Sequence, residues 1–380
     1  MGLPNHFELI ASDGHARTGK LTTPHGLVRT PAFMPVGTAG AMKGVHWRDV
    51  REAGSDIVLG NTYHLMLRPG AERIARLGGL HRFMRWKGPI ITDSGGFQVM
   101  SLSKLRKIND AGVTFQSHID GSTHVLTPER AVEIQCLLGS DIQMQLDECI
   151  ALPATPEETR GAVDRSLAWA ELCKREFARQ LDNGTARPGQ ALFGIVQGGT
   201  DLAIRERSAG ALVPMGFDGY AIGGLSVGEQ RTAMFDTVTA TAAMLPQQRP
   251  RYFMGIGDPD GLLGVIERGV DMFDCVLPTR LGRTGSALVP GGKLNLRNAR
   301  FARDGAPLVE GCGCPACRDF SRAYIRHLIT QDEITGLRLL SVHNLHQVIE
   351  LVAGARRAIV EGRFARFREE LAAEAAGAIN

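Results

Sequence analysis

An acidic residue, Asp274, lies in the short apolar run 270–277, which Pro278 ends. The run is too short for a helix, so we predict a buried strand that ends near Asp274. A buried carboxylate is costly unless another group pairs with it or a reaction uses it. Arg280 and Arg283 follow closely, and a carboxylate beside cations suits chemistry on a phosphate-bearing substrate. A buried ion pair is the alternative interpretation.

Polar residues follow several other apolar runs in the same way. They are Asn61, Asp93, Asp147, Gln197 and the Gly223–Gly224 backbone, with Phe97 and Met254 as apolar neighbours. Carboxylates and an amide can bind the ring N–H and amino groups of a planar heterocycle, and glycines let backbone amides approach it. Taken singly, each residue could instead be an ordinary turn glycine or core side chain.

Several carboxylates around one pocket permit a division of roles. One can act as a nucleophile and another as a general acid/base, as in the cleavage of a sugar carbon by glycosidases. We predict Asp274 as the nucleophile, because its neighbouring arginines favour the charged form, and Asp93 as the general acid/base. The residues alone leave the reverse assignment open.

Three of the seven cysteines crowd into one short segment, which favours a metal site over disulfides. They are Cys312, Cys314 and Cys317, in the spacing C-x-C-x2-C. Together with His343 they would fill the four tetrahedral positions of a structural zinc ion. Buried free thiols are the alternative, and His327 and His346 compete with His343 as the fourth ligand. The ion would order a segment with few apolar residues.

Basic residues surround this cluster and outnumber three acidic ones in the same segment. They are Arg280, Arg283, Lys293, Arg297, Arg300, Arg303, Arg318, Arg322 and Arg326. We predict a track for a phosphate backbone, with a solvated helix face as the alternative. The arginines of residues 356–368 either extend this track or keep a helix soluble.

Eight short apolar runs must position these groups. They are residues 32–36, 56–61, 89–93, 141–147, 192–197, 219–223, 252–256 and 272–275. Helix start signals lie between several of them, at Thr127, at Thr155 and at Ser226 with Glu229. Eight buried strands that alternate with helices predict an α/β fold, a (β/α)8 TIM barrel with its chemistry at the C-terminal strand ends. A doubly wound open sheet is the alternative.

The length of 380 residues fits one large barrel with an appendage. We predict hairpins in residues 7–36 and a single catalytic domain over residues 1–380. Within it, residues 280–345 form a zinc-binding, RNA-contacting insertion between the last strand and the last helix, which is predicted from about residue 347 to 376.

The remaining composition limits the class of protein. The net charge of +3 excludes a wholly basic nucleic-acid binder, so an RNA-binding surface must be a local patch. The first residues, MGLPNHFELIASDG, lack the features of a signal peptide, and no run approaches the roughly 20 apolar residues of a membrane span. We therefore expect a cytoplasmic protein with no membrane association.

The motifs together resemble those of the queuine tRNA-ribosyltransferases, the bacterial tRNA-guanine transglycosylases. They are TDSGGFQ (92–98), QLDEC (145–149), GIVQGG (194–199), IGGLSVGE (222–229), DMFDCVLPTR (271–280) and the cysteine cluster. The resemblance runs from about residue 7 to about residue 370. It implies an enzyme that exchanges the wobble guanine of tRNAs with GUN anticodons (Asp, Asn, His, Tyr) for 7-aminomethyl-7-deazaguanine, the queuosine precursor. The exchange would be a double displacement.

The resemblance also implies residue roles. Asp274 would attack the ribose C1′ to form a covalent aspartyl-tRNA intermediate, with Asp93 as general acid/base. The implied substrate-binding residues are Asp93, Phe97, Asp147, Cys149, Gln197, Gly224, Leu225 and Met254, of which Leu225 receives the aminomethyl group through its carbonyl. The implied RNA-binding residues are Arg280 and Arg283, and the implied zinc ligands are Cys312, Cys314, Cys317 and His343. A homodimer is implied, and a redox or nucleotide cofactor is not.

Two other functions remain open on the residues alone. A non-catalytic RNA-binding partner would keep the fold but lack acidic residues, whereas Asp93, Asp147 and Asp274 are all present. A metal-dependent barrel hydrolase predicts His-x-His near the first strand, and the sequence there contains no such pattern.

Overall fold

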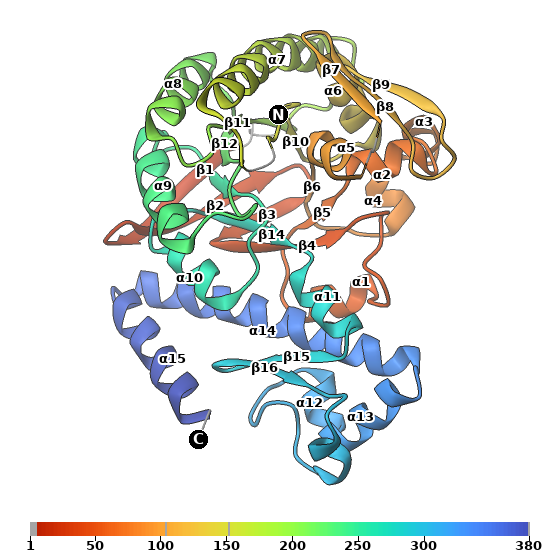
Figure 1. The fold of residues 1–380 in the computed structure, drawn as a ribbon, viewed down its shortest axis with the longest axis vertical. Coiled ribbons are helices and arrows are strands. Elements are labelled where there is room, and N and C mark those ends of the chain that lie inside the picture. Colours follow the sequence, from red (N-terminus) through yellow and green to blue (C-terminus); the bar gives the residue numbers. More distant parts are fainter. Residues whose placement is uncertain (1–5, 103–104, 151–152, 379–380) are drawn as a thin grey trace.

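The computed structural model describes residues 6–102, 105–150 and 153–378. Eight parallel strands close into a barrel, which confirms the predicted (β/α)8 architecture and excludes the open sheet (Figure 1). In barrel order they are β4 (Ala32–Gly37), β5 (Val58–Gly60), β6 (Ile90–Thr92), β10 (Ile142–Met144), β11 (Ala191–Val196), β12 (Gly219–Ile222), β13 (Arg251–Phe253) and β14 (Met272–Cys275). Each overlaps one of the eight predicted runs. The first five residues, which bear on the signal-peptide prediction, lie outside the described residues.

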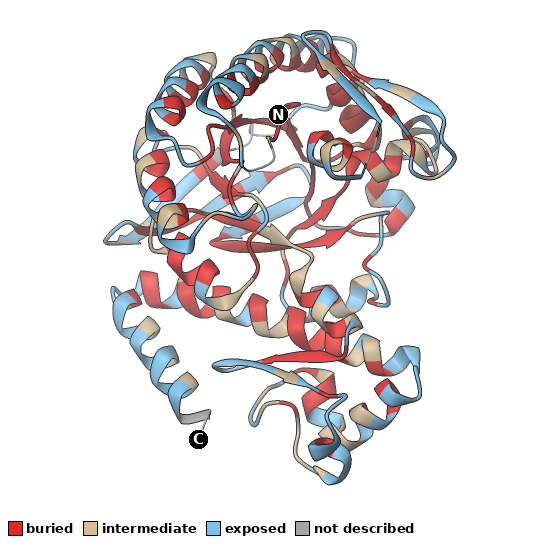
Figure 2. Cartoon of the chain, viewed as in Figure 1, coloured by how far each residue is buried: buried red, intermediate tan, exposed pale blue. Residues whose placement is uncertain are grey.

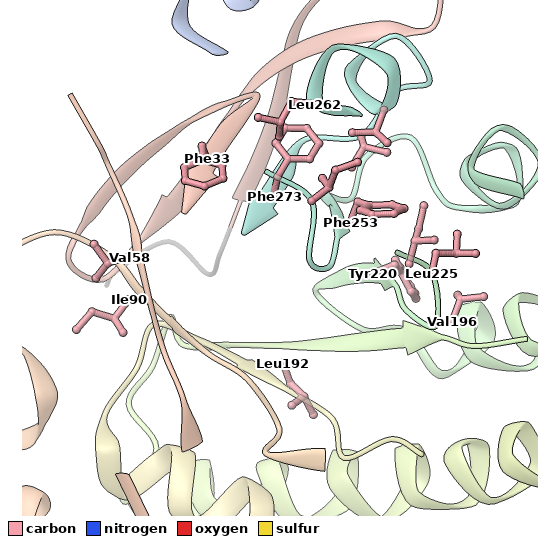
Figure 3. Packing of buried hydrophobic residues seen from close by; sticks show 14 of the residues in the cluster. Phe33, Val58, Ile90, Leu192, Val196, Tyr220, Leu225, Phe253, Leu262 and Phe273 are labelled. Atoms are coloured by element: carbon pink, nitrogen blue, oxygen red, sulfur yellow. The ribbon is translucent and has the colours of Figure 1, made fainter. Parts of the chain in front are cut away.

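Strand alternation decides which side chains enter the barrel. Met272 and Tyr252 belong to the apolar cluster inside the barrel, whereas Phe273 and Phe253 belong to the cluster packed between strands and helices. Figure 3 shows part of this outer cluster. Because successive side chains alternate, the residue two positions after Met272, Asp274, shares its inward face.

Helices surround the barrel, and their buried faces turn toward it while their outer faces are exposed (Figure 2). They are α1 (Trp47–Glu52), α2 (Thr62–Leu67), α3 (Ala71–Arg76), α4 (Gly79–Met84), α5 (Gly96–Leu102), α6 (Pro128–Leu138), α7 (Pro156–Asp182), α8 (Leu202–Leu212), α9 (Arg231–Met244) and α10 (Pro259–Ile266). Thr127 and Thr155 cap α6 and α7 as predicted. The predicted cap at Ser226 is wrong, because α9 begins only at Arg231 and its N-cap residue is Gln230.

Two three-stranded antiparallel sheets accompany the barrel in the part of the chain that the structure describes. The predicted hairpins form β1 (His6–Asp13), β2 (Ala16–Thr23) and β3 (Gly26–Thr30). Their side chains Phe7, Leu21 and Val28 join the cluster inside the barrel. The second sheet, β7 (Arg106–Asn109), β8 (Gly112–Gln116) and β9 (Thr123–Leu126), was not predicted from the sequence.

The C-terminal part follows directly on β14. It comprises α11 (Leu277–Arg283), β15 (Ser286–Val289), β16 (Gly292–Asn295), a 3-10 helix (Ala299–Arg303), α12 (Pro315–Asp319), α13 (Arg322–Thr330), α14 (Ile334–Val360) and α15 (Phe364–Ala378). Helix α14 contacts both β4 of the barrel and α12, α13 and β15 (Figure 1). It begins at Ile334, earlier than predicted, so His343 lies within it. The stretch predicted as the last helix is divided between α14 and α15. None of the described helices is long and apolar enough to cross a membrane.

Candidate active site and metal centre

Asp93 lies just beyond the C-terminal end of β6 and is buried. The backbone N–H of Thr62 donates to Asp93 Oδ1 at 2.7 Å, and the Asn61 amide donates to Oδ2. Burial and, to a smaller extent, the negative charge of Asp274 raise the pKa of Asp93 to about 6, although its hydrogen bonds oppose this. A carboxyl group with this pKa can donate and accept a proton near neutral pH.

Asp147 forms a second polar edge with Gln197. Gln197 Nε2 donates to Asp147 Oδ2 at 2.6 Å, and Ser94 Oγ donates to Oδ1 at 3.2 Å. Burial raises the pKa of Asp147 to about 6 as well. The carboxylate and the amide together offer both acceptors and a donor to a flat ligand.

The raised pKa of Asp147 implies a cost of ionisation that a mutation can reveal. Its folded pKa of about 6 lies above the ordinary value of 3.8, so the charge destabilises the native state above pH 6 and this penalty fades as the pH falls through 6 toward 4. We expect Asp147→Asn to raise the free energy of unfolding by about 2–3 kcal/mol near pH 7.5 and by roughly half as much near pH 5, measured by urea denaturation.

Asp141→Asn is the matched control for this prediction. Asp141 is also buried, but hydrogen bonds from His25 and His81 outweigh burial and lower its pKa. Its charge therefore stabilises the native state at neutral pH, and Asp141→Asn should lower the free energy of unfolding there. Equal effects of Asp147→Asn at both pH values would contradict the raised pKa of Asp147.

Asp274 is the penultimate residue of β14 and accepts two hydrogen bonds on Oδ1. The donors are the Tyr252 hydroxyl at 2.6 Å and the Gly255 backbone N–H at 3.0 Å. Burial raises the pKa of Asp274, and burial beside Asp274 raises that of Tyr252 well above 10, so Tyr252 remains a neutral donor.

The expected support of Asp274 by arginines is wrong. Arg280 is exposed on α11 and Arg283 donates to Thr279 Oγ1 at 3.3 Å, and neither forms an ion pair with Asp274. The chain turns into α11 at Leu277, directly after the strand, so the arginines continue along a helix. The hydrogen bonds from Tyr252 and Gly255 stabilise the charge instead.

The predicted residues converge at one end of the barrel. Asp93 and Asp274 are close enough for the charge of one to shift the pKa of the other group. Gly224 approaches Gln197 closely: a Cβ at Gly224 would lie 2.2 Å from Gln197 Oε1, and the φ of Gly224 is +65°. Only glycine fits this position.

The apolar candidates differ in exposure. Leu225 and Cys149 are buried, Met254 is half-buried, and Phe97 is 50% exposed. Burial raises the pKa of the Cys149 thiol to about 12, so it remains protonated and is a poor nucleophile at neutral pH. The carboxylates are therefore the reactive groups of this region.

Four contributors to the site were missed: Tyr252, Ser94 and the backbone N–H groups of Thr62 and Gly255. Tyr252 lies in a predicted strand, and alternation with Met254 indicates that its side chain points into the barrel. Nothing in the sequence indicated that its hydroxyl would donate to Asp274 on β14. Ser94 lies within the TDSGGFQ motif without a predicted role. The backbone N–H groups of Thr62 and Gly255 carry no side-chain signal and could not have been found.

The cysteine cluster forms a compact group with His343. The distances from His343 Nδ1 are 3.3 Å to the sulfurs of Cys314 and Cys317 and 3.9 Å to that of Cys312. All four ligand atoms lie within 4.8 Å of one another. His343 Nε2 donates to the Leu288 carbonyl at 2.8 Å, which leaves Nδ1 free for a metal. This group can hold a metal ion, and it favours His343 over the exposed His327.

A second group of candidate ligands lies at the opposite end of the barrel. His25 Nδ1 and His81 Nε2 contact the two oxygens of Asp141 at 2.7 and 3.1 Å, and the two rings stack with centroids 3.5 Å apart. Imidazole lone pairs lie in the ring plane, so stacked rings cannot direct both at one ion. The backbone N–H groups of His25 and Ile90 also donate to Asp141. This group links the β2–β3 turn to the barrel by hydrogen bonds.

The basic residues of the C-terminal part divide into paired and unpaired sets. Ion pairs join Arg297 to Asp332, Arg318 to Asp319 and Arg322 to Asp304. Exposed residues with no ion pair in the described part of the chain are Arg280, Lys293, Arg300 and Arg303. The arginines of residues 356–368 pair with glutamates or, for Arg356, with the Pro31 carbonyl. The available positive surface is therefore concentrated in residues 280–303.

Comparison with known proteins gives one consistent result. Residues 12–376 match the family model described as queuine tRNA-ribosyltransferase. The queuine tRNA-ribosyltransferase of Rhizobium meliloti (strain 1021) is 58% identical over 364 residues, which cover 96% of this chain and 95% of the relative. The proteins of that name from Cereibacter sphaeroides (strain ATCC 17029 / ATH 2.4.9) and Novosphingobium aromaticivorans are 58% and 56% identical over 361 residues. Both matches cover 95% of this chain. They cover 94% of the Cereibacter protein and 96% of the Novosphingobium protein.

Proposed function

The chain belongs to the queuine tRNA-ribosyltransferase family of pentosyltransferases, and on this premise we propose that it exchanges a guanine of tRNA for a modified base. The site is the wobble guanine of the tRNAs with GUN anticodons, and the incoming base is 7-aminomethyl-7-deazaguanine. The observation that carries the proposal is the convergence of three acidic residues, two with a pKa of about 6, at the C-terminal end of the barrel. The reaction takes place in the cytoplasm, where tRNA is modified.

Asp274 attacks the ribose C1′ in the first displacement. A carboxylate oxygen of Asp274 forms a bond to C1′, the bond from C1′ to the base nitrogen breaks, and the electron pair leaves with the base. Asp93 supplies a proton to the departing base. In the second displacement a nitrogen of the incoming base bonds to C1′, the bond from C1′ to Asp274 breaks with its electron pair returning to the carboxylate, and Asp93 takes a proton from the incoming base. Tyr252 and the Gly255 N–H hold Asp274 Oδ1, which leaves Oδ2 for the attack.

The base lies against the polar edge of Asp147, Gln197 and Gly224. The carboxylate accepts from the ring N–H and the exocyclic amino group, and the amide of Gln197 and the backbone N–H of Gly224 donate to ring acceptors. The Leu225 carbonyl receives the aminomethyl group. Phe97 and Met254 contact the ring faces, and Cys149 lines the pocket. Phe97 is half-exposed, as a side chain that stacks on an incoming base should be.

A structural zinc ion, one per subunit, is held by Cys312, Cys314, Cys317 and His343. The donor set of three thiols and one imidazole with a free Nδ1 fits four-coordinate zinc, which leaves no position for a reacting water. Bound there, the ion would order residues 280–345, which form the RNA-contacting part of a single catalytic domain. Arg280 and Arg283, on the helix after Asp274, contact the tRNA backbone beside the reacting ribose.

The protein acts as a homodimer in which the second subunit helps to hold the tRNA. On α13, Tyr324 is 44% exposed and stacks on Phe320 with ring centroids 5.4 Å apart, and such an exposed aromatic surface is typical of an interface. Sedimentation of the full chain tests the assembly. A monomer at all accessible concentrations would refute it.

Incorporation of labelled guanine into unmodified tRNA tests the function. Exchange with no net loss of base supports a transferase. Binding of tRNA without exchange would instead identify a non-catalytic RNA-binding partner, and release of base without incorporation would identify a hydrolase. A tRNA whose wobble guanine is replaced by adenine is the control and should take up no label.

A further inference from the structure

Helix α8 carries a fully buried arginine, Arg205, behind the ends of β11 and β12. Its Nε donates to the Gly199 carbonyl at 2.6 Å, Nη2 donates to the Gly223 carbonyl at 2.8 Å, and Nη1 reaches the Val196 carbonyl at 3.4 Å. No carboxylate forms an ion pair with Arg205 within the residues that the structure describes. The guanidinium therefore contacts the same two loops that present Gln197 and Gly224.

A buried cation held only by carbonyls needs an explanation. Desolvation of a charge is expensive, and neutral donors could satisfy the same carbonyls. Burial lowers the pKa of Arg205 to about 10 although the negative charge of Glu229 opposes this, and Arg205 is still charged at neutral pH. The positive charge is thus retained at a cost, directly behind the base-binding residues.

Resting on the function proposed above, we propose that Arg205 is a positioning residue that acts on the departing base through the Gly223–Gly224 peptide. A hydrogen bond from a cation to the Gly223 carbonyl polarises that peptide and makes the Gly224 N–H a stronger donor. This N–H has no acceptor among the described residues. Gly224 also has no Cβ that could block a ligand from reaching this N–H.

The effect belongs to the first displacement. When the bond from C1′ to the base breaks, its electron pair passes to the base, and negative charge spreads over the ring and its carbonyl oxygen until a proton arrives. A polarised N–H aimed at that oxygen stabilises this charge more than it stabilises the neutral base. Arg205 should therefore affect kcat more than the KM for base or tRNA.

The test compares Arg205→Gln and Arg205→Lys with Arg251→Gln. Arg251 is a matched control, because it is also buried, donates to the carbonyls of Leu245 and Gly269, and has a pKa lowered to about 10, yet it lies where β13 begins, at the other end of the barrel. We expect Arg205→Gln to lower kcat for guanine exchange by about ten- to hundredfold with KM changed less than about threefold. Arg251→Gln should lower Tm similarly and leave kcat unchanged.

Arg205→Lys supplies an independent readout. A buried lysine loses its proton at lower pH than an arginine, so its exchange rate should fall on the alkaline side where the native rate does not. This fall in rate at alkaline pH can be measured in Arg205→Lys even if Arg205→Gln fails to fold. An Arg205→Gln kcat equal to that of Arg251→Gln, or no fall in rate at alkaline pH in Arg205→Lys, would overturn the role of Arg205. Native protein that exchanges no guanine would refute the proposed function itself and the role of Arg205 with it.

Discussion

Asp274→Asn should form no covalent adduct with tRNA and should lower the guanine exchange rate by about three orders of magnitude or more. The neutral amide keeps the shape of the side chain and can still accept from Tyr252 and Gly255, but it cannot attack the ribose carbon. Denaturing gel electrophoresis of protein mixed with tRNA measures the adduct directly. Base binding should persist, since the polar edge of Asp147 and Gln197 is untouched.

Tyr252→Phe is the matched control for Asp274→Asn. It removes the 2.6 Å hydrogen bond to Asp274 but keeps the carboxylate, so the adduct should still form, at a reduced rate. An undiminished adduct in Asp274→Asn would remove Asp274 as the nucleophile. If the adduct disappeared in Asp93→Asn alone, the roles of the two carboxylates would be reversed, as the sequence by itself allows.

Cys314→Ser should release the zinc ion and weaken tRNA binding by about tenfold or more, because structural zinc in small sites contributes about 10–16 kcal/mol of apparent binding free energy near neutral pH. The cluster of buried residues around Cys314 and Cys317 is separate from the two barrel clusters, so the subdomain depends on its own small core. Elemental analysis measures the metal, and titration with labelled tRNA measures the affinity. Base binding at the barrel should change little.

Cys136→Ser provides the comparison for the metal. Cys136 is buried on α6 and contacts Gln143, away from the cluster. We expect this variant to keep one zinc per chain and full tRNA affinity. Full zinc content in Cys314→Ser would show that the metal site is misplaced. Loss of zinc without loss of tRNA binding would separate the metal from RNA recognition.

The barrel was predictable because its signals are local. Each buried strand is a short apolar run, and Thr127 and Thr155 mark helix starts through hydrogen bonds to residues three positions ahead. Ser226 failed as such a signal, since its carboxylate partner Glu229 accepts from the N–H groups of Ser226 and Val227 in a loop with a left-handed residue. The same sequence pattern serves a helix cap and this loop, and only the backbone distinguishes them.

The small sheet β7–β9 escaped prediction for a related reason. Its strands are short, and β7 and β9 are largely exposed, with polar residues such as Arg106 and Lys107. They therefore lack the apolar run that marked the barrel strands. Their pairing involves a few inward residues, among them Val113 and Phe115, which pack on the helices around the barrel. Such strands are defined by their partners more than by their composition.

The sequence by itself determined which residue types lie at the strand ends, and the motifs that contain these residues indicated the family. Alternation along each strand, a local property, already directed Asp93 and Asp274 inward. Tertiary structure alone decided the electrostatics: Tyr252 and Gly255, not Arg280 or Arg283, support Asp274, and Arg205 lies behind Gly223 and donates to its carbonyl. Burial and through-space contacts set the pKa and the partners of a charged group, and both depend on segments that are distant in the chain.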